Sequence, residues 1–385
     1  MSGQRKSILF LTGTRADFGK LKPLMDVVQN DSACECRVSI TGMHMLNEYG
    51  YTAKEVLAKQ YEHYYTFVNQ ILSEPMDLVL ANTVHGLGRY VHNSPPDAII
   101  IHGDRIEALA GAIVGCLRNI TTIHIEGGEL SGTIDELIRH SVSKLAHIHL
   151  VANQDAANRL IQLGESASAI YAIGSPDIDV MFSPDLPSIE QVRERYEIPF
   201  DRYAIACYHP VTTELDRTEE NVKQFFKALL TSGDRYVLIY PNNDEGAEVI
   251  LSCIREVGDS PNLRVIPSLR FEYFLTLLRE SQFIIGNSSA AIREAPVYGV
   301  PTVNVGTRQH KRFDYQSILN VDPECDAIID AIKQAKEAGR YPPTDHFGSG
   351  DSSKKFAALL QSNKFWEQSK QKVFEDLPST RARSQ

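Results

Sequence analysis

Two short polar runs in this chain contain the residue types needed for acid–base chemistry. They are His102-Gly103-Asp104-Arg105 and His124-Ile125-Glu126-Gly127-Gly128-Glu129, and each follows an apolar stretch. Such β-branched stretches predict buried parallel strands, and ligands bind beyond the carboxyl ends of those strands. Asp104 and Glu126 would then face one crevice, where two carboxylates could act on a neutral, weakly acidic substrate. The alternative is that each carboxylate only caps the helix that follows it.

A third carboxylate, Asp135, opens a predicted helix nine residues after Glu126. A glycine loop that starts at Ser131 leads into this helix. Asp135 and Arg139 are four residues apart and share a helix face, a spacing that most often means a solvent-exposed ion pair. The other interpretation is that the start of the helix returns Asp135 to the crevice of Asp104 and Glu126. The sequence leaves both interpretations open.

The turn from Thr12 to Lys20 could bind an anion. It follows a predicted strand and opens a helix, so Gly13 and Gly19 allow a ligand to approach backbone N–H groups closely. Arg15 could add a charge-assisted hydrogen bond. The turn does not match G-x-G-x-x-G, and the second predicted strand ends without an acidic residue for a ribose, which disfavours an NAD-dependent dehydrogenase. The alternative is an ordinary glycine turn.

Polar residues also follow three predicted strands in the second half of the chain. They are His209, the run 241–244 and the run Gly286-Asn287-Ser288-Ser289. The last of these has two hydroxyls and a helix start in one turn, which predicts a phosphate site. Glu294 could accept hydrogen bonds from a ribose, and residues 306–312 supply cations. A single strand-end histidine is more often structural, but together these residues predict a bound nucleotide diphosphate whose other end meets the carboxylates of the first half.

The composition narrows the class of protein. A chain of 385 residues predicts two domains, and a net charge of -10 argues against a nucleic-acid partner. The chain has no apolar stretch near the roughly 20 residues of a membrane helix and no signal-peptide pattern, which favours a cytoplasmic protein away from membranes. Six scattered cysteines without a matching histidine cluster predict no disulfide and no metal site.

Strand and helix patterns alternate along the chain, which predicts βαβ units and parallel sheets. The segment from Gly174 to Pro199 interrupts this alternation with four prolines, so we place a domain junction near its start. We therefore predict an α/β fold of two Rossmann-like domains whose parallel sheets face a central cleft. The predicted strands are 7–11, 36–40, 98–101, 121–125, 148–151, 170–173, 203–208, 236–240, 263–266, 283–285 and 302–305; the predicted helices are 20–28, 76–92, 106–117, 135–146, 154–163, 219–230, 245–257, 271–280 and 291–298.

Seven motifs together resemble the hydrolysing UDP-N-acetylglucosamine 2-epimerases over about residues 7 to 365, and most closely those of bacterial sialic acid capsule synthesis. The resemblance implies the two-domain GT-B arrangement, with a C-terminal helix near Ser353 to Gln361 crossing back to the first domain. The implied domains are 1–173, 174–352 and 353–385, the last ending in a tail from Asp376. The motifs are Thr12-Gly13-Thr14-Arg15-Ala16-Asp17, His102 to Arg105, His124 to Glu129, Asp135 with Ile138-Arg139-His140, His209-Pro210, Gly286 to Ser289 and Gly306-Thr307-Arg308-Gln309.

The resemblance also assigns the site residues. The catalytic residues it implies are the carboxylates Asp104, Glu126 and Asp135, with His209 near the diphosphate, and no metal or cofactor. Phe271 matches the lining of the uracil pocket. The other implied contacts to UDP or sugar are Arg15, Gly19, Arg105, Arg139, Asn242, Leu269, Ser288, Ser289, Glu294 and Arg308.

The implied reaction converts UDP-N-acetylglucosamine and water into UDP and N-acetylmannosamine. A carboxylate removes the C2 proton while UDP leaves C1, water then adds to the 2-acetamidoglucal, and a proton returns to the other face of C2. The sequence does not say which carboxylate is the base, and a homodimer or homotetramer is the implied assembly. Three alternatives are a non-hydrolysing epimerase that yields UDP-N-acetylmannosamine, a hydrolysing enzyme for UDP-N,N'-diacetylbacillosamine, and a catalytically silent UDP-sugar-binding protein.

Overall fold

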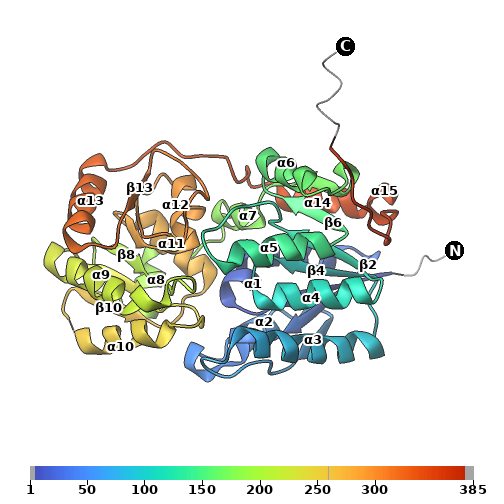
Figure 1. The fold of residues 1–385 in the computed structure, drawn as a ribbon, viewed down its shortest axis with the longest axis horizontal. Coiled ribbons are helices and arrows are strands. Elements are labelled where there is room, and N and C mark those ends of the chain that lie inside the picture. The colour runs from blue at the N-terminus through green and yellow to red at the C-terminus, as the bar shows by residue number, and fades with distance from the viewer. Residues whose placement is uncertain (1–4, 259, 378–385) are drawn as a thin grey trace, which may run out of the picture.

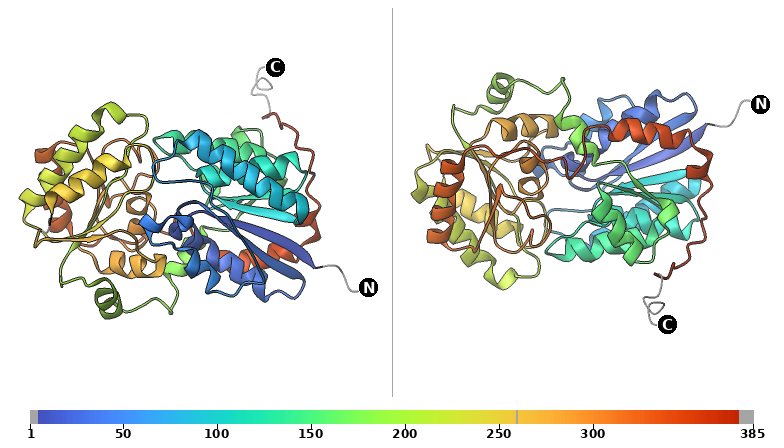
Figure 2. Two further views of the ribbon diagram at one scale, coloured as in Figure 1. Left: turned by 90° about the horizontal axis from the view of Figure 1, so that it is seen from below. Right: turned by 90° about the horizontal axis from the view of Figure 1, so that it is seen from above.

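The structure is a computed structural model that describes residues 5–258 and 260–377 of the chain (Figure 1). Within these residues the chain forms two parallel sheets, of seven and six strands, with helices on both faces of each (Figure 2). The predicted fold class is confirmed. The tail predicted from Asp376 lies outside the described residues from position 378 onward.

The first sheet has the strand order β3-β2-β1-β4-β5-β6-β7. Alternate residues of its central strand pack on opposite faces, Ile8 against α1 and Leu9 against α4. Burial on both faces explains why the strands are apolar throughout. The elements are β1 Lys6–Thr12, α1 Arg15–Asn30, β2 Cys34–Ile40, η1 Gly42–Met45, η2 Asn47–Tyr49, α2 Ala53–Leu57, β3 His63–Thr66, α3 Met76–Asn93, β4 Ala98–His102, α4 Ile106–Leu117, β5 Thr121–Ile125, α5 Ile134–Leu145, β6 Ile148–Val151, α6 Gln154–Gln162, η3 Ala167–Ala169 and β7 Ile170–Ala172.

The second sheet has the order β10-β9-β8-β11-β12-β13. In each sheet the strand order reverses beside the first strand, at β1 and at β8, and such switch points are where ligands bind in open α/β sheets. The elements are α7 Pro176–Met181, α8 Ile189–Tyr196, β8 Ala204–Cys207, η4 Leu215–Arg217, α9 Thr218–Ser232, β9 Tyr236–Ile239, α10 Ala247–Val257, β10 Leu263–Ile266, α11 Phe271–Glu280, β11 Ile284–Gly286, η5 Ser289–Ala291, α12 Glu294–Val297, β12 Thr302–Val305, β13 Ile318–Val321 and α13 Cys325–Ala338.

The predicted helix 291–298 is wrong. The structure has only the single turn of η5 and the four residues of α12 in this segment. Pro296 explains the break, because it has no N–H to donate to the carbonyl oxygen of Ile292 and its ring crowds that position. The edge strands β3 and β13 were not predicted from the sequence, because both are short and only partly buried.

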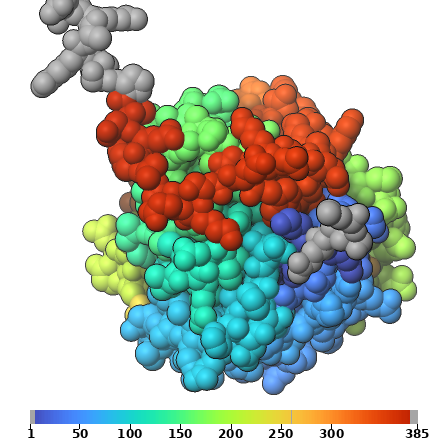
Figure 3. All heavy atoms as spheres, turned by 90° about the vertical axis from the view of Figure 1, so that its right-hand side faces the viewer, coloured from blue at the N-terminus to red at the C-terminus, as the bar shows by residue number. Residues whose placement is uncertain are grey.

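The last two helices, α14 (Ser352–Leu360) and α15 (Asn363–Trp366), lie against the first domain (Figure 3). Phe356 and Phe365 are fully buried there in the same apolar cluster as Ile8 and Val28. The chain therefore returns to the first sheet after forming the second. The domain limits at 173/174 and 352/353 stay a prediction.

The sequence predicted neither a membrane-spanning helix nor a disulfide. No helix among residues 5–258 and 260–377 has the length and apolar character needed to cross a bilayer. The six cysteines are all free thiols.

Candidate active site

A cavity of about 320 Å³ lies between the carboxyl ends of the two sheets. It is lined by the segments after β1, β4 and β5 from one side and after β8, β9 and β11 from the other. Gly19 lies just behind its wall, since a Cβ added there would come within 2.3 Å of the Phe271 Cβ. All the other predicted site residues line it: Arg15, Asp104, Arg105, Glu126, Asp135, Arg139, His209, Asn242, Leu269, Phe271, Ser288, Ser289, Glu294 and Arg308.

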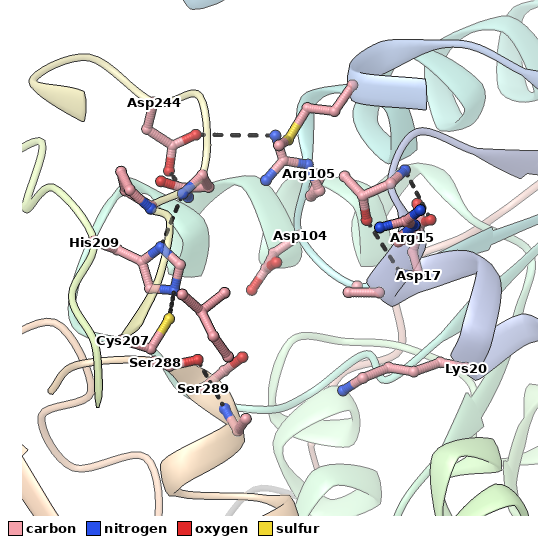
Figure 4. A pocket seen from close by; sticks show the side chains of 18 of the residues that line it. Arg15, Asp17, Lys20, Asp104, Arg105, Cys207, His209, Asp244, Ser288 and Ser289 are labelled. Carbon is pink, nitrogen blue, oxygen red and sulfur yellow. Dashed lines mark hydrogen bonds and ion pairs between the residues drawn. The ribbon is translucent and has the colours of Figure 1, made fainter. Parts of the chain in front are cut away.

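Asp104 points into the centre of the pocket (Figure 4). The preceding residue, Gly103, has a φ of 70°, and its carbonyl oxygen is 2.8 Å from Nε2 of the buried His124. Arg139 donates a hydrogen bond to the Asp104 carboxylate. Burial would raise the pKa of Asp104, but the charges of Arg139 and two further arginines hold it below the usual value. Asp104 is therefore an ionised carboxylate in a fixed position.

Glu126 follows β5 with a φ of 64°, which is rare for a residue with a side chain. Its Oε1 accepts hydrogen bonds from Arg293 Nη2 at 2.7 Å and Ser175 Oγ at 2.6 Å. Burial would raise the pKa of this carboxyl, yet the charges of Arg293, His102 and Lys20 hold it well below its usual range. A carboxylate with so many cations around it is poorly suited to carry a proton.

Asp135 does not pair with Arg139. Arg139 turns to Asp104, and Asp135 Oδ2 lies 3.2 Å from Arg308 Nη2 of the second domain. The exposed i,i+4 ion pair weighed for this helix is therefore wrong, and the helix start does return Asp135 to the crevice. Burial and the charge of Asp104 raise the pKa of Asp135. Two neighbouring carboxyl groups thus have pKa values shifted in opposite directions.

His209 faces Asp104 from the second domain (Figure 4). Its Nδ1 accepts a hydrogen bond from the backbone N–H of Asn242 at 3.0 Å, which leaves the ring proton on Nε2. Burial and the charges of Arg308 and Arg105 hold the pKa of His209 well below its usual value. The imidazole is therefore neutral, and its Nε2–H, which lies 3.3 Å from Cys207 Sγ in this structure, is the one hydrogen-bond donor that the ring could turn to a ligand.

The turn after β11 has less helix behind it than the sequence indicates. Ser288 and Ser289 lead into one turn of 3₁₀ helix, so no long helix dipole points at the cavity. The guanidinium of Arg308 reaches this turn and donates from Nη1 to the backbone oxygen of Asn287 at 3.2 Å. An anion here would be bound mainly by hydroxyls, backbone N–H groups and Arg308.

The predicted cations of the cavity already have carboxylate partners. Arg15 pairs with Glu55 and donates to Ser268 Oγ at 2.8 Å across the cleft. Arg105 Nη2 lies 3.9 Å from Asp244 of the second domain. An anionic ligand therefore has to compete with protein carboxylates for these groups.

The sequence model of a family described as UDP-N-acetylglucosamine 2-epimerase matches residues 26–361. The chain belongs to this family. A UDP-N-acetylglucosamine 2-epimerase of Neisseria meningitidis serogroup B is 51% identical over 375 residues, covering 97% of this chain and 99% of the relative. A Legionella pneumophila protein named UDP-N,N'-diacetylbacillosamine 2-epimerase (hydrolyzing) is 31% identical over 370 residues, covering 93% and 96%.

Solved structures of the epimerase family share the fold. The crystal structure of Methanocaldococcus jannaschii UDP-GlcNAc 2-epimerase in complex with UDP-GlcNAc and UDP matches with a TM-score of 0.79. The match covers 92% of this chain and 99% of that one at 18% sequence identity. At this identity the likeness concerns the fold alone, which is the GT-B-like pair of parallel-sheet domains.

In this member of the epimerase family, buried charges that were not predicted from the sequence lie beneath the cavity. Lys20 of α1 lies 2.7 Å from Glu294 and 3.2 Å from Asp177. Arg293, at the start of α12, contacts Glu126 and Glu129. One signal was available, because Lys20 and Arg293 each adjoin a predicted site residue, Gly19 and Glu294.

Proposed function

We propose that this chain is a hydrolysing UDP-N-acetylglucosamine 2-epimerase, which converts UDP-N-acetylglucosamine and water into UDP and N-acetylmannosamine. The observation that carries the proposal is the pair Asp104 and Asp135, which line the cavity from the first domain. The pKa of Asp104 is lowered and that of Asp135 is raised. Such a pair supplies a base and an acid at the same pH.

The nucleotide fits the second wall of the cavity. Phe271 and Leu269 offer an apolar surface for the base, and Ser288 and Ser289 offer hydroxyls for the diphosphate. The Oε2 atom of Glu294 is buried without a hydrogen-bond partner among the described residues. A ribose hydroxyl would satisfy it, as an unpaired buried acceptor requires.

In the first half of the proposed reaction, Asp104 accepts the C2 proton and the C1–O bond to UDP breaks. The electrons of the C–H bond form the C1=C2 double bond of 2-acetamidoglucal, and those of the C1–O bond leave with the phosphate. Arg308 and the neutral His209 stabilise the leaving diphosphate by charge and by hydrogen bonding. The ionised Glu126 stabilises positive charge that develops on the sugar ring.

In the second half, Asp135 donates its proton to C2 and a water oxygen bonds to C1. The water proton passes to the Asp135 carboxylate, and Asp104 returns its proton to solvent. The new proton arrives on the face of C2 opposite Asp104, which inverts that carbon. Neither half uses a metal or a redox cofactor. In this proposal the product feeds sialic acid synthesis in the cytoplasm, and the chain works as a homodimer or homotetramer.

One relative favours a second candidate substrate. The Legionella protein is named for UDP-N,N'-diacetylbacillosamine and for hydrolysis. Its name supports hydrolysis. The question left open is which groups the sugar of the substrate carries at C4 and C6. A non-hydrolysing epimerase is the remaining alternative.

The test is to incubate the enzyme with UDP-N-acetylglucosamine in deuterated water and identify the products by NMR. We expect free N-acetylmannosamine with deuterium at C2, together with UDP. UDP-N-acetylmannosamine as the product would overturn the hydrolysing proposal. If UDP-N-acetylglucosamine is unchanged, the same assay with UDP-N,N'-diacetylbacillosamine identifies the second candidate, and no reaction with either sugar refutes both.

A further inference from the structure

Arg293 is a fully buried cation that the second domain inserts beneath the sugar end of the cavity. Its side chain has 0% of its surface exposed. The guanidinium lies 4.8 Å from the centre of the Phe347 ring and donates to Ser175 Oγ at 2.6 Å. Its carboxylate contacts are Glu126 at 2.7 Å, Glu129, and Asp177 at 3.8 Å.

These contacts leave Glu126 with one occupied and one free oxygen. Oε1 accepts from Arg293 and Ser175, and His102 Nε2 lies 3.2 Å from the same atom. Among the described residues no hydrogen bond reaches Oε2, and Glu126 lines the cavity. The backbone of Glu126 is fixed as well, because Arg139 donates to its carbonyl oxygen at 2.8 Å.

Arg293 belongs to the same short segment as the proposed nucleotide contacts. Its backbone N–H donates to the carbonyl oxygen of Ser289 at 2.9 Å, and Glu294 is the next residue. A nucleotide bound by Ser289 and Glu294 would therefore contact the turn whose Arg293 side chain binds Glu126. Arg293 thus connects the proposed nucleotide contacts of the second domain with a carboxylate of the first domain.

We propose that Arg293 is a positioning residue that ties the nucleotide-binding turn to Glu126 and keeps the Glu126 carboxylate ionised with Oε2 facing the sugar. This inference rests on the proposed function, because it concerns the carboxylate assigned there to stabilise positive charge. Arg293 itself is not among the residues that line the cavity. Its effect on turnover passes entirely through Glu126.

The contrasting view is that Arg293 only joins the domains, as buried ion pairs do in many proteins. The two views differ in the pH dependence that follows when Arg293 is removed. The titratable and charged groups that face Glu126 are then Lys20, His102, Arg139, Asp104, Glu129 and Asp177, three of them acidic. Glu126 would protonate at a higher pH than before, and its stabilising charge would be lost on the acid side.

The experiment compares wild type with Arg293→Met and Arg293→Lys, measuring kcat and KM between about pH 5 and pH 8.5 and UDP affinity by calorimetry. For Arg293→Met we expect kcat to fall about 100-fold, with KM and UDP affinity within about threefold. The pH profile of the remaining kcat should have an acid limb, a decline toward low pH, that the wild-type profile lacks. Arg293→Lys should recover about tenfold in kcat and remove that limb.

Arg293→Met takes one cation away from three buried carboxylates, so a second variant separates folding from positioning. Arg293→Met combined with Glu129→Gln removes one of the surplus charges. We expect it to unfold at a higher temperature than Arg293→Met and to keep the acid limb. The proposal would be overturned if the folded variants showed the same pH profile of kcat as wild type. It would also be overturned if UDP affinity fell in parallel with kcat.

A readout without turnover separates this inference from the proposed function. The ¹³Cδ resonance of Glu126, assigned with Glu126→Gln in glutamate-labelled protein, should stay at its ionised position in wild type and titrate in Arg293→Met. Wild type that releases no N-acetylmannosamine refutes the function, and the NMR titration still decides the role of Arg293. Identical titrations in the two proteins refute the role of Arg293 whatever the reaction is.

Discussion

Asp135 and Arg308 form an ion pair across the cleft, with 3.2 Å between Asp135 Oδ2 and Arg308 Nη2. Burial and the charge of Asp104 raise the pKa of Asp135, and the charge of Arg308 offsets part of that rise. A diphosphate bound at Ser288 would attract Arg308 away from this pair. Loss of that cation raises the pKa of Asp135 further, so nucleotide binding would prepare Asp135 to act as an acid.

Asp135→Asn should change affinity and turnover in opposite directions. Removing the carboxylate frees Arg308 for the diphosphate, so we expect UDP to bind a few times more tightly, about 1 kcal/mol at most. Loss of the acid should lower kcat by about 10²- to 10³-fold. Calorimetry and N-acetylmannosamine release measure the two effects. Asp201→Asn is the control, because that side chain is 93% exposed, and weaker UDP binding by Asp135→Asn would contradict the argument.

The pH profile should carry the signature of the same pair. Asp135 acts in its protonated form, so turnover falls as pH rises through its raised pKa. Arg308→Met removes a charge that lowers this pKa, and the alkaline limb of kcat should therefore move to higher pH. UDP affinity should fall in the same variant. A limb that stays in place or moves to lower pH would show that another group causes it.

Asp104→Asn and, separately, Glu126→Gln should abolish turnover while UDP binding survives. Asp104 is the proposed base and Glu126 the proposed stabilising charge, and neither lies among the proposed nucleotide contacts. We expect kcat to fall by about 10³-fold or more in each, with the Kd for UDP within about threefold. The Kd is measured by calorimetry on protein whose folding is checked by circular dichroism. Loss of UDP affinity in either folded variant would refute the role assigned to that carboxylate.

Features set by local sequence were predictable. The bounds predicted for α4 and α11, 106–117 and 271–280, agree with the structure, and α11 buries Phe271, Leu275 and Leu278, which recur at helical spacing. The central strands were predictable because burial on both faces makes them apolar throughout. The edge strand β3, His63–Thr66, was not, since it is short and has no fully buried residue.

Contacts between distant segments were not predictable. Asp135 meets Arg308, which lies 173 positions later and belongs to the other domain. The i,i+4 spacing of Asp135 and Arg139 suggested a pair that the structure does not contain. Lys20 shows the same limit, because only the packing of α1 against α7 and α12 reveals why a lysine is buried there. Sequence spacing identifies the residues near strand ends, but their partners depend on how the two domains meet.

Gly19→Ala should weaken nucleotide binding with little effect on the chemical step. A Cβ at Gly19 would come within 2.3 Å of the Phe271 Cβ, so the aromatic side chain would have to shift from its place in the proposed base pocket. We expect KM to rise about tenfold with kcat within about threefold. Gly88→Ala is the matched control, because its Cβ would meet only Val114, at 4.0 Å, and alanine favours helix. Equal effects of the two substitutions on KM would contradict the assignment of Phe271.

Phe356→Ala should destabilise the first domain although it lies in the second-to-last helix of the described chain. Phe356 is fully buried in the cluster that contains Ile8, and truncation of such a side chain typically costs about 3–5 kcal/mol. The urea transition that reports the first domain should therefore move to lower concentration, as followed by circular dichroism. Lys355→Ala is the neighbouring control, with a side chain 43% exposed and an expected change within about 0.5 kcal/mol. A loss below about 1 kcal/mol for Phe356→Ala would mean that the helix lies on the first sheet without contributing to its core, against the burial of both Phe356 and Phe365.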